Sequence, residues 1–166
     1  MFLKVGNVDI WATKQPAIRQ QNNVKNMAIW RDSEVFKVKS VNDLVGLPFS
    51  KYNCWEICEL YYRKILKKEL PTYKIDAFDF PLVNKTMLSE IRTPKWIILD
   101  KPEPNCIALM KLGYCSATVN HAGVILPDGR MLQAYESTGS VIVDPQNQLW
   151  KRIIKYYIKP NVEYKK

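Results

Sequence analysis

The sequence predicts an α+β domain in which one helix packs on an antiparallel sheet. Two observations lead to this class: one well-marked helical segment lies at 54–68, and five strand-like runs follow between 95 and 143. A helix followed by consecutive strands, rather than a regular alternation of the two, is typical of α+β proteins. With 166 residues, of which 47% are hydrophobic and 25% charged, the chain is long enough to bury one core.

Three parts can be distinguished along the chain. Residues 1–40 read as short strands joined by a polar loop, an N-terminal extension without a core of its own; residues 41–158 form the main domain, and residues 159–166 a C-terminal tail. No window reaches 18 consecutive apolar residues, and no basic segment precedes a long apolar run at the N-terminus. We therefore expect no membrane span and no signal peptide, and synthesis in the cytoplasm.

The main helix is expected to begin directly after Asn53, a favourable N-cap residue, and to cover Cys54–Lys68, which contains neither Gly nor Pro. Four of its residues recur at positions i, i+4, i+7 and i+11 and predict a buried stripe: Cys54, Cys58, Tyr61 and Ile65. A second, shorter helix is expected near Lys85–Ile91.

Strand patterns dominate the second half of the chain. Strands are expected over Lys95–Leu99, Cys106–Lys111, Val119–Leu126, Arg130–Glu136 and Ser140–Val143, while Leu149–Ile158 fits a helix or a strand. The turn Pro127-Asp128-Gly129 suits a three-residue hairpin loop in which Gly129 takes the left-handed conformation. Such a loop pairs Leu126 with Arg130, and therefore Gly123 with Gln133.

Cys54 is the candidate nucleophile. A nucleophilic cysteine acts as its thiolate, and both a helix N-terminus and an adjacent imidazolium lower the pKa of a thiol. Because Cys54 follows the expected N-cap, the free N–H groups there should lower its pKa and could also hold an oxyanion. The plain alternative is a buried cysteine in an ordinary first turn. Cys58, Cys106 and Cys115 are interpreted as structural residues.

His121 is the only histidine in the chain, so any cysteine–histidine mechanism must use it. The three-residue loop places Gln133 on the same face of the hairpin as His121, one diagonal step away. The Gln133 amide oxygen could then bind one ring nitrogen and leave the other for Cys54. A two-residue loop would put Glu136 on that face instead, so Glu136 is the second choice. A solvated strand side chain is the alternative for Gln133.

The net charge of +9 favours an anionic partner, such as nucleic acid, an acidic wall polymer or an acidic protein. The basic residues are scattered and form no stripe with interleaved aromatic residues, which argues against nucleic acid. A zinc module is a further alternative, but Cys54 and Cys58 lie within one continuous helix, and Cys106 and Cys115 lack the spacing of a zinc knuckle.

Two blocks of the sequence carry a family resemblance. The first contains Leu44-Val45-Gly46-Leu47-Pro48-Phe49, Asn53-Cys54-Trp55-Glu56 and Glu69-Leu70-Pro71-Thr72-Tyr73; the second runs from Asn120-His121-Ala122-Gly123-Val124 to Asp128-Gly129-Arg130-Met131-Leu132-Gln133-Ala134. Together, over about residues 41–158, they resemble the NlpC-type cysteine peptidases, particularly those encoded with phage tails. In that family a third polar residue stands twelve positions after the histidine, and Gln133 occupies this place.

The resemblance implies a papain-like α+β core of the NlpC type, with Cys54, His121 and Gln133 as catalytic residues and no metal or organic cofactor. It implies hydrolysis of an amide bond in peptidoglycan stem peptides, typically after D-γ-glutamyl. The protein would act in a virion tail or at the bacterial cell wall, with phage tail-tip proteins as candidate partners.

The sequence departs from the family pattern before the nucleophile. Asn53 replaces a common Asp, and the stretch usual before the cysteine is shortened to Pro48–Tyr52. Tyr52 is therefore only a candidate for the family's oxyanion-supporting tyrosine, and Trp55 is a second candidate for substrate or oxyanion contacts. Two other functions stay open: a tail structural or assembly protein that keeps the fold with little activity, and an acyltransferase that uses the same acyl-enzyme with another acceptor.

Overall fold

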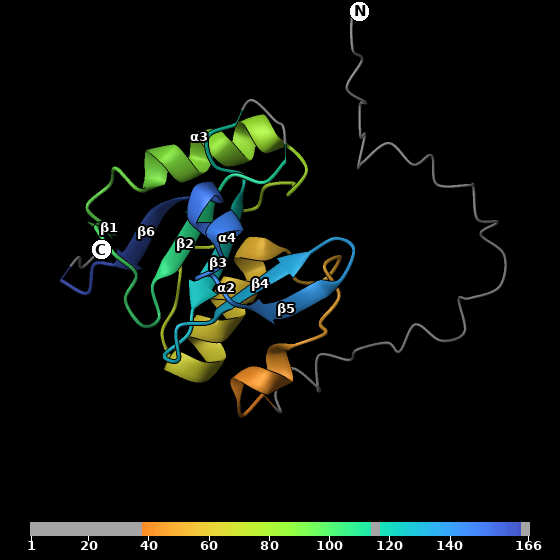
Figure 1. Ribbon diagram of the computed structural model, residues 1–166. Helices are drawn as coiled ribbons and strands as arrows, with labels where there is room; N and C mark the ends of the chain where they lie inside the picture. Colours follow the sequence, from red (N-terminus) through yellow and green to blue (C-terminus); the bar gives the residue numbers. More distant parts are fainter. Residues whose placement is uncertain (1–37, 114–116, 164–166) are drawn as a thin grey trace, which may run out of the picture. The chain divides into compact units, whose positions relative to one another are not determined.

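The computed structural model describes residues 38–113 and 117–163, and these contain four helical stretches of different kinds around one sheet (Figure 1). The expected strands within 1–37, and Cys115, lie outside the described residues. The helical elements are the 3₁₀ turn η1 (Val41–Leu44), α2 (Cys54–Tyr61) with its continuation η2 (Tyr62–Leu66), α3 (Phe80–Glu90) and α4 (Gln148–Ile153). In the described part of the chain no helix has the length and apolar character needed to cross a membrane.

The sheet is antiparallel and six-stranded, with the spatial order β1-β6-β2-β3-β4-β5. Its strands are β1 (Trp96–Leu99), β2 (Ile107–Met110), β3 (His121–Ile125), β4 (Met131–Tyr135), β5 (Gly139–Val143) and β6 (Ile154–Pro160). The expected α+β class is therefore confirmed, and each of the five expected strands has a counterpart that is trimmed or shifted by one or two residues at its ends.

The segment that fitted either a helix or a strand contains both. Its first part forms α4, and the chain then enters β6, which lies between β1 and β2. The strand ends at Pro160, two residues beyond the expected start of the C-terminal tail, and the backbone N–H of Asn161 donates to the Lys95 carbonyl. Its place inside the sheet depends on partners about 50 residues earlier, which local pattern does not reveal.

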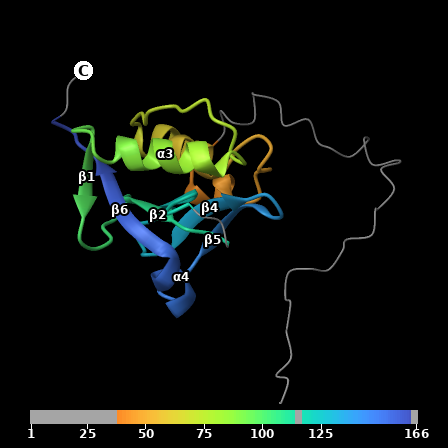
Figure 2. The ribbon, with the colours of Figure 1, turned by 90° about the horizontal axis from the view of Figure 1, so that it is seen from above.

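Two layers of helix enclose the sheet. The helix α2 packs on β3 and β4, and α4 packs against β6. Figure 2 shows α3 and α4 on opposite sides of the sheet. On the α4 side, a cluster that includes Ala108, Met110 and Met131 is covered in part by Trp150. The core thus lies on both faces of the sheet, which explains why β2 and β3 are buried along their whole length.

The main helix begins where the N-cap pattern places it. The Asn53 side chain accepts hydrogen bonds from the N–H groups of Trp55 and Glu56, at 2.9 and 3.0 Å, and Glu56 returns a bond to the Asn53 N–H. This reciprocal capping box satisfies donors that the first turn leaves unpaired. The start of α2, and with it the position of Cys54, is fixed by this local chemistry.

The end of the main helix differs from the expected continuous α-helix. After Tyr61 the chain forms a π turn, and it ends at Lys67 in the left-handed conformation (φ 55°). The wider turn lets neighbouring Tyr61 and Tyr62 both be buried, and both hydroxyl groups donate to Asn105. Ile65, expected in the buried stripe, is only half-buried as a result.

The second helix starts earlier than expected. It runs over Phe80–Glu90, because Asp79 caps it by accepting a hydrogen bond from the Leu82 N–H at 3.1 Å and Pro81 stands in the first turn. The sequence analysis missed this Asp–x–Pro start signal. The backbone of α3 makes no extensive contact with any other helix or strand of the described chain. This separation leaves space beneath the helix.

Candidate active site

Cys54 and His121 line the same cleft. Cys54 is the first residue of α2, and His121 is the first residue of β3, so the packing of α2 on β3 brings the two together. Both are buried, with 6% and 5% of their surface exposed. The backbone N–H of Ala122, which follows His121 directly, interacts with the Cys54 sulfur. Positions 54 and 121 are thus neighbours in space, as the sequence analysis expected.

Gln133 holds the histidine ring. The His121 Nε2 and the Gln133 Oε1 are 2.9 Å apart in a fully buried contact. The pairing of Gly123 with Gln133 and the left-handed Gly129 (φ 85°) confirm the expected hairpin register. Because the amide oxygen only accepts, Nε2 must carry the proton and Nδ1 is the nitrogen left with a lone pair. Glu136, the second choice, lies after the end of β4 and is exposed.

Tyr135 supports the other side of the imidazole and was not foreseen. Its ring stacks on His121 with 5.2 Å between centroids and 7° between planes. Burial raises the pKa of the Tyr135 hydroxyl to about 12, although the Gln133 amide opposes this shift. The position two residues after Gln133 in a strand shares its face, so strand periodicity could have suggested Tyr135 as a partner of the ring.

The electrostatics of Cys54 correct one expectation. Burial raises the pKa of its thiol to about 11, although the N–H groups of Ala122, Trp55 and Cys54 itself lower it in part. The helix N-terminus therefore does not produce a resting thiolate, because loss of hydration outweighs the dipole. Burial likewise lowers the pKa of His121 to about 4, against a smaller opposing effect of Gln133. At neutral pH the pair is a neutral thiol beside a neutral imidazole.

The donors available to an oxyanion are fewer than the helix start suggests. The N–H groups of Trp55 and Glu56 are occupied by the Asn53 side chain. The N–H of Cys54 and that of Ala122 both interact with the thiol sulfur, where a tetrahedral intermediate would form. These two backbone groups are the candidates for stabilising its negative oxygen.

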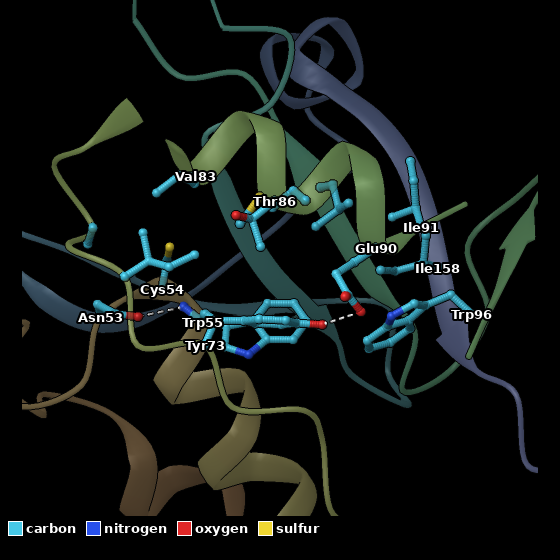
Figure 3. Close-up of a pocket in the computed structure, with 14 residues that line it drawn as sticks. Asn53, Cys54, Trp55, Tyr73, Val83, Thr86, Glu90, Ile91, Trp96 and Ile158 are labelled. Atoms are coloured by element: carbon cyan, nitrogen blue, oxygen red, sulfur yellow. Dashed lines mark hydrogen bonds between the residues drawn. The ribbon is translucent and has the colours of Figure 1, made fainter. Parts of the chain in front are cut away.

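The two candidate contacts beside Cys54 have different positions. Tyr52 lies in the turn before α2, where its N–H donates to Pro48 and the Lys51 ammonium stands 5.8 Å from its ring centre, and it is not among the residues that line either cleft next to Cys54. Trp55 lines an apolar pocket on the α3 side of Cys54, with its indole N–H donating to the Pro71 carbonyl at 2.9 Å. The structure therefore brings Trp55, but not Tyr52, to a cavity at the nucleophile (Figure 3).

The remaining described cysteines are core residues. The Cys58 thiol donates to the Cys54 carbonyl, with 3.2 Å between sulfur and oxygen, and Cys106 belongs to the cluster beneath α4. Burial raises the pKa of both thiols. Within residues 38–113 and 117–163, no group of three or more His, Cys, Asp or Glu side chains is placed to hold a metal ion.

The open side of the cleft is apolar. Phe49, Phe78 and Phe80 line it opposite His121, and the rings of Phe49 and Phe78 pack at 5.8 Å. Phe78 and Phe80 are exposed, so the entrance presents aromatic surface to solvent. Comparison of the chain with models of known protein families gives no match, and comparison with curated protein sequences gives none either.

Proposed function

We propose that this protein is a cysteine hydrolase that cleaves amide bonds through an acyl-enzyme on Cys54. The observation that carries the proposal is the shared cleft: a cysteine at a capped helix start and a buried histidine oriented by a glutamine line one cavity. This combination of nucleophile, base and orienting group is the arrangement that nucleophilic catalysis requires. A papain-like core of the NlpC type is part of the proposal, supported by the packing of α2 on an antiparallel sheet.

The neutral resting pair indicates how the reaction would proceed. As the Cys54 sulfur attacks the carbonyl carbon, His121 takes the thiol proton through Nδ1, and the new C–S bond forms while the carbonyl oxygen becomes negative. His121 then gives that proton to the leaving amine as the C–N bond breaks. Water, deprotonated by His121, releases the acid product. Gln133 keeps Nε2 protonated throughout and leaves Nδ1 free for each transfer.

The proposed substrate is the stem peptide of peptidoglycan, and the proposed setting is a phage tail or the bacterial cell wall, with tail-tip proteins as partners. Support comes from the two sequence blocks similar to NlpC-type peptidases and from the net charge of +9. A positive protein associates faster with an anionic wall polymer. Transfer of the acyl group to an acceptor other than water would use the same residues.

A tail structural or assembly protein with little activity is the second candidate. The observation that favours it is the pair of pKa values, about 11 for Cys54 and about 4 for His121, which keeps both groups uncharged. A cysteine whose fold had lost its catalytic role would be free to remain protonated. The two candidates make opposite predictions for a Cys54 substitution in a wall-digestion assay.

Purified protein is incubated with Gram-negative-type peptidoglycan and with soluble stem peptides, and new amino termini are counted. We expect Cys54→Ala to abolish their release and Cys106→Ala, a matched change at another buried thiol, to retain it. Activity on intact wall should fall with added salt more than activity on the short peptide, because screening weakens docking. Equal behaviour of the wild type and Cys54→Ala, with the fold confirmed and the test repeated on virions that carry the substitution, would favour the structural protein.

A further inference from the structure

A second cavity begins at Cys54 and extends beneath α3. One stripe of α3 forms its roof through Val83, Thr86 and Met87, and the sheet residues Leu109 and Ile158 close it from below. Its volume is about 50 Å³, which accommodates roughly four methyl-sized groups. Figure 3 shows Cys54 at one end of this pocket and Trp96 at the other.

The chemistry of the proposed reaction assigns the two cavities to different halves of the substrate. The leaving amine must receive a proton from His121, and His121 lines the cleft with the aromatic entrance but not the pocket beneath α3. The acyl part remains bonded to the Cys54 sulfur while the amine departs. A pocket that contains Cys54 without His121 is therefore placed to receive the acyl part.

The walls of the pocket are apolar up to its far end. Trp55 forms part of one wall, with its ring 5.3 Å from the ring of Tyr73 and 5.9 Å from that of Trp96. At the far end the Tyr73 hydroxyl donates to Glu90 at 2.8 Å, and Lys95 stands 3.3 Å from the same carboxylate. The single acidic group of the pocket is thus already paired and does not provide a free charge.

One polar atom at the far end lacks a partner. The indole Nε1–H of Trp96 is buried, in a residue only 6% exposed, and forms no hydrogen bond with any described residue. It lies toward the Tyr73 hydroxyl, among the groups that line the pocket. Buried donors are almost always paired, so an unpaired one in a cavity indicates the place of a ligand acceptor.

We infer that the pocket beneath α3 binds the acyl part of the substrate and selects a short apolar group that carries a hydrogen-bond acceptor at its far end. The inference rests on the proposed acyl-enzyme chemistry of Cys54 and adds the class of acyl group that this site takes. Trp55 and the α3 stripe contact the apolar part, and Trp96 donates to the acceptor.

The test uses p-nitrophenyl esters, whose acyl groups can be varied with one leaving group. The Cys54 thiol attacks the ester carbonyl, an S–C bond forms, and nitrophenolate leaves while His121 takes the thiol proton. Nitrophenolate release and the mass of the acylated protein are measured. We expect the rate to rise from acetyl to pentanoyl by about fourfold for each methylene group buried, and to drop for decanoyl, which exceeds the pocket.

Matched variants on α3 locate the binding site. Thr86→Phe fills the pocket and should abolish the dependence on chain length, whereas Lys85→Phe, on the exposed side of the same helix, should preserve it. A pentanoyl group with a keto oxygen near its end should react faster than plain pentanoyl, by about fivefold for one hydrogen bond. Trp96→Phe keeps the ring, removes the donor and should cancel this gain.

The outcomes separate the inference from the proposed function. Acylation of Cys54 without a chain-length preference overturns the inference and leaves the hydrolase proposal standing, and so does a preference that is lost in Phe78→Ser, at the other cleft, but not in Thr86→Phe. Equal nitrophenolate release by the wild type and Cys54→Ala overturns both. The chain-length series on the wild type tests the inference even if Thr86→Phe fails to fold.

Discussion

Acid should destabilise this fold through His121. The folded state holds the pKa of His121 near 4, against 6.5 for an unperturbed histidine. The unfolded chain therefore binds a proton at a higher pH than the folded one, and stability falls as pH decreases from about 6.5 to about 4. A difference of about 2.5 in pKa, each unit corresponding to 1.36 kcal/mol, gives a loss of about 3 kcal/mol below pH 4.

The assay is urea unfolding followed by tryptophan fluorescence, at pH 7 and at steps down to pH 4. Asp43 and Asp128, whose pKa values are lowered by hydrogen bonds, lose stabilisation in overlapping acidic conditions and must be separated from His121. His121→Gln provides the control, since a neutral amide can still bond Gln133 and does not titrate. The wild type should lose about 3 kcal/mol more than this variant between pH 7 and pH 4. Parallel curves for the two proteins would refute the reasoning.

Three further predictions concern the orienting residue, the thiol and the loops. Gln133→Ala should lower turnover about 10–1000-fold with the fold intact, as other orienting contacts do, while Glu136→Gln does much less; the reverse ranking would contradict the hydrogen bond at His121. The rate of Cys54 alkylation should keep rising with pH toward about 11, because burial raises its pKa, and a plateau near neutral pH would indicate a resting thiolate. Gly139→Ala should destabilise the fold by more than Gly129→Ala, as measured by thermal unfolding. Both glycines have positive φ, but a Cβ at Gly139 would stand 2.3 Å from a backbone carbonyl oxygen, whereas Gly129 faces open space.

Local sequence determined the features of the site that depend on neighbours in the chain. The Asn53 cap fixed the start of α2 and placed Cys54 in its first turn, because the cap bonds to N–H groups two and three residues ahead. The three-residue loop around Gly129 fixed the hairpin register, and strand alternation then put Gln133 beside His121. Each of these interactions spans few residues, so the residue types and their spacing suffice to predict it.

Only the tertiary structure decided what surrounds the site. The helix-start argument predicted a lowered thiol pKa, but packing of α2 on β3 buries Cys54 and raises that pKa, because burial depends on residues nearly 70 positions away. The ambiguous segment became both α4 and β6 for the same reason, since its strand half pairs with β1 and β2. The pocket beneath α3, with the unpaired Trp96 donor, arises from three separate elements meeting at Cys54. Desolvation and cavity shape are sums over many distant neighbours, and no local pattern in the chain records them.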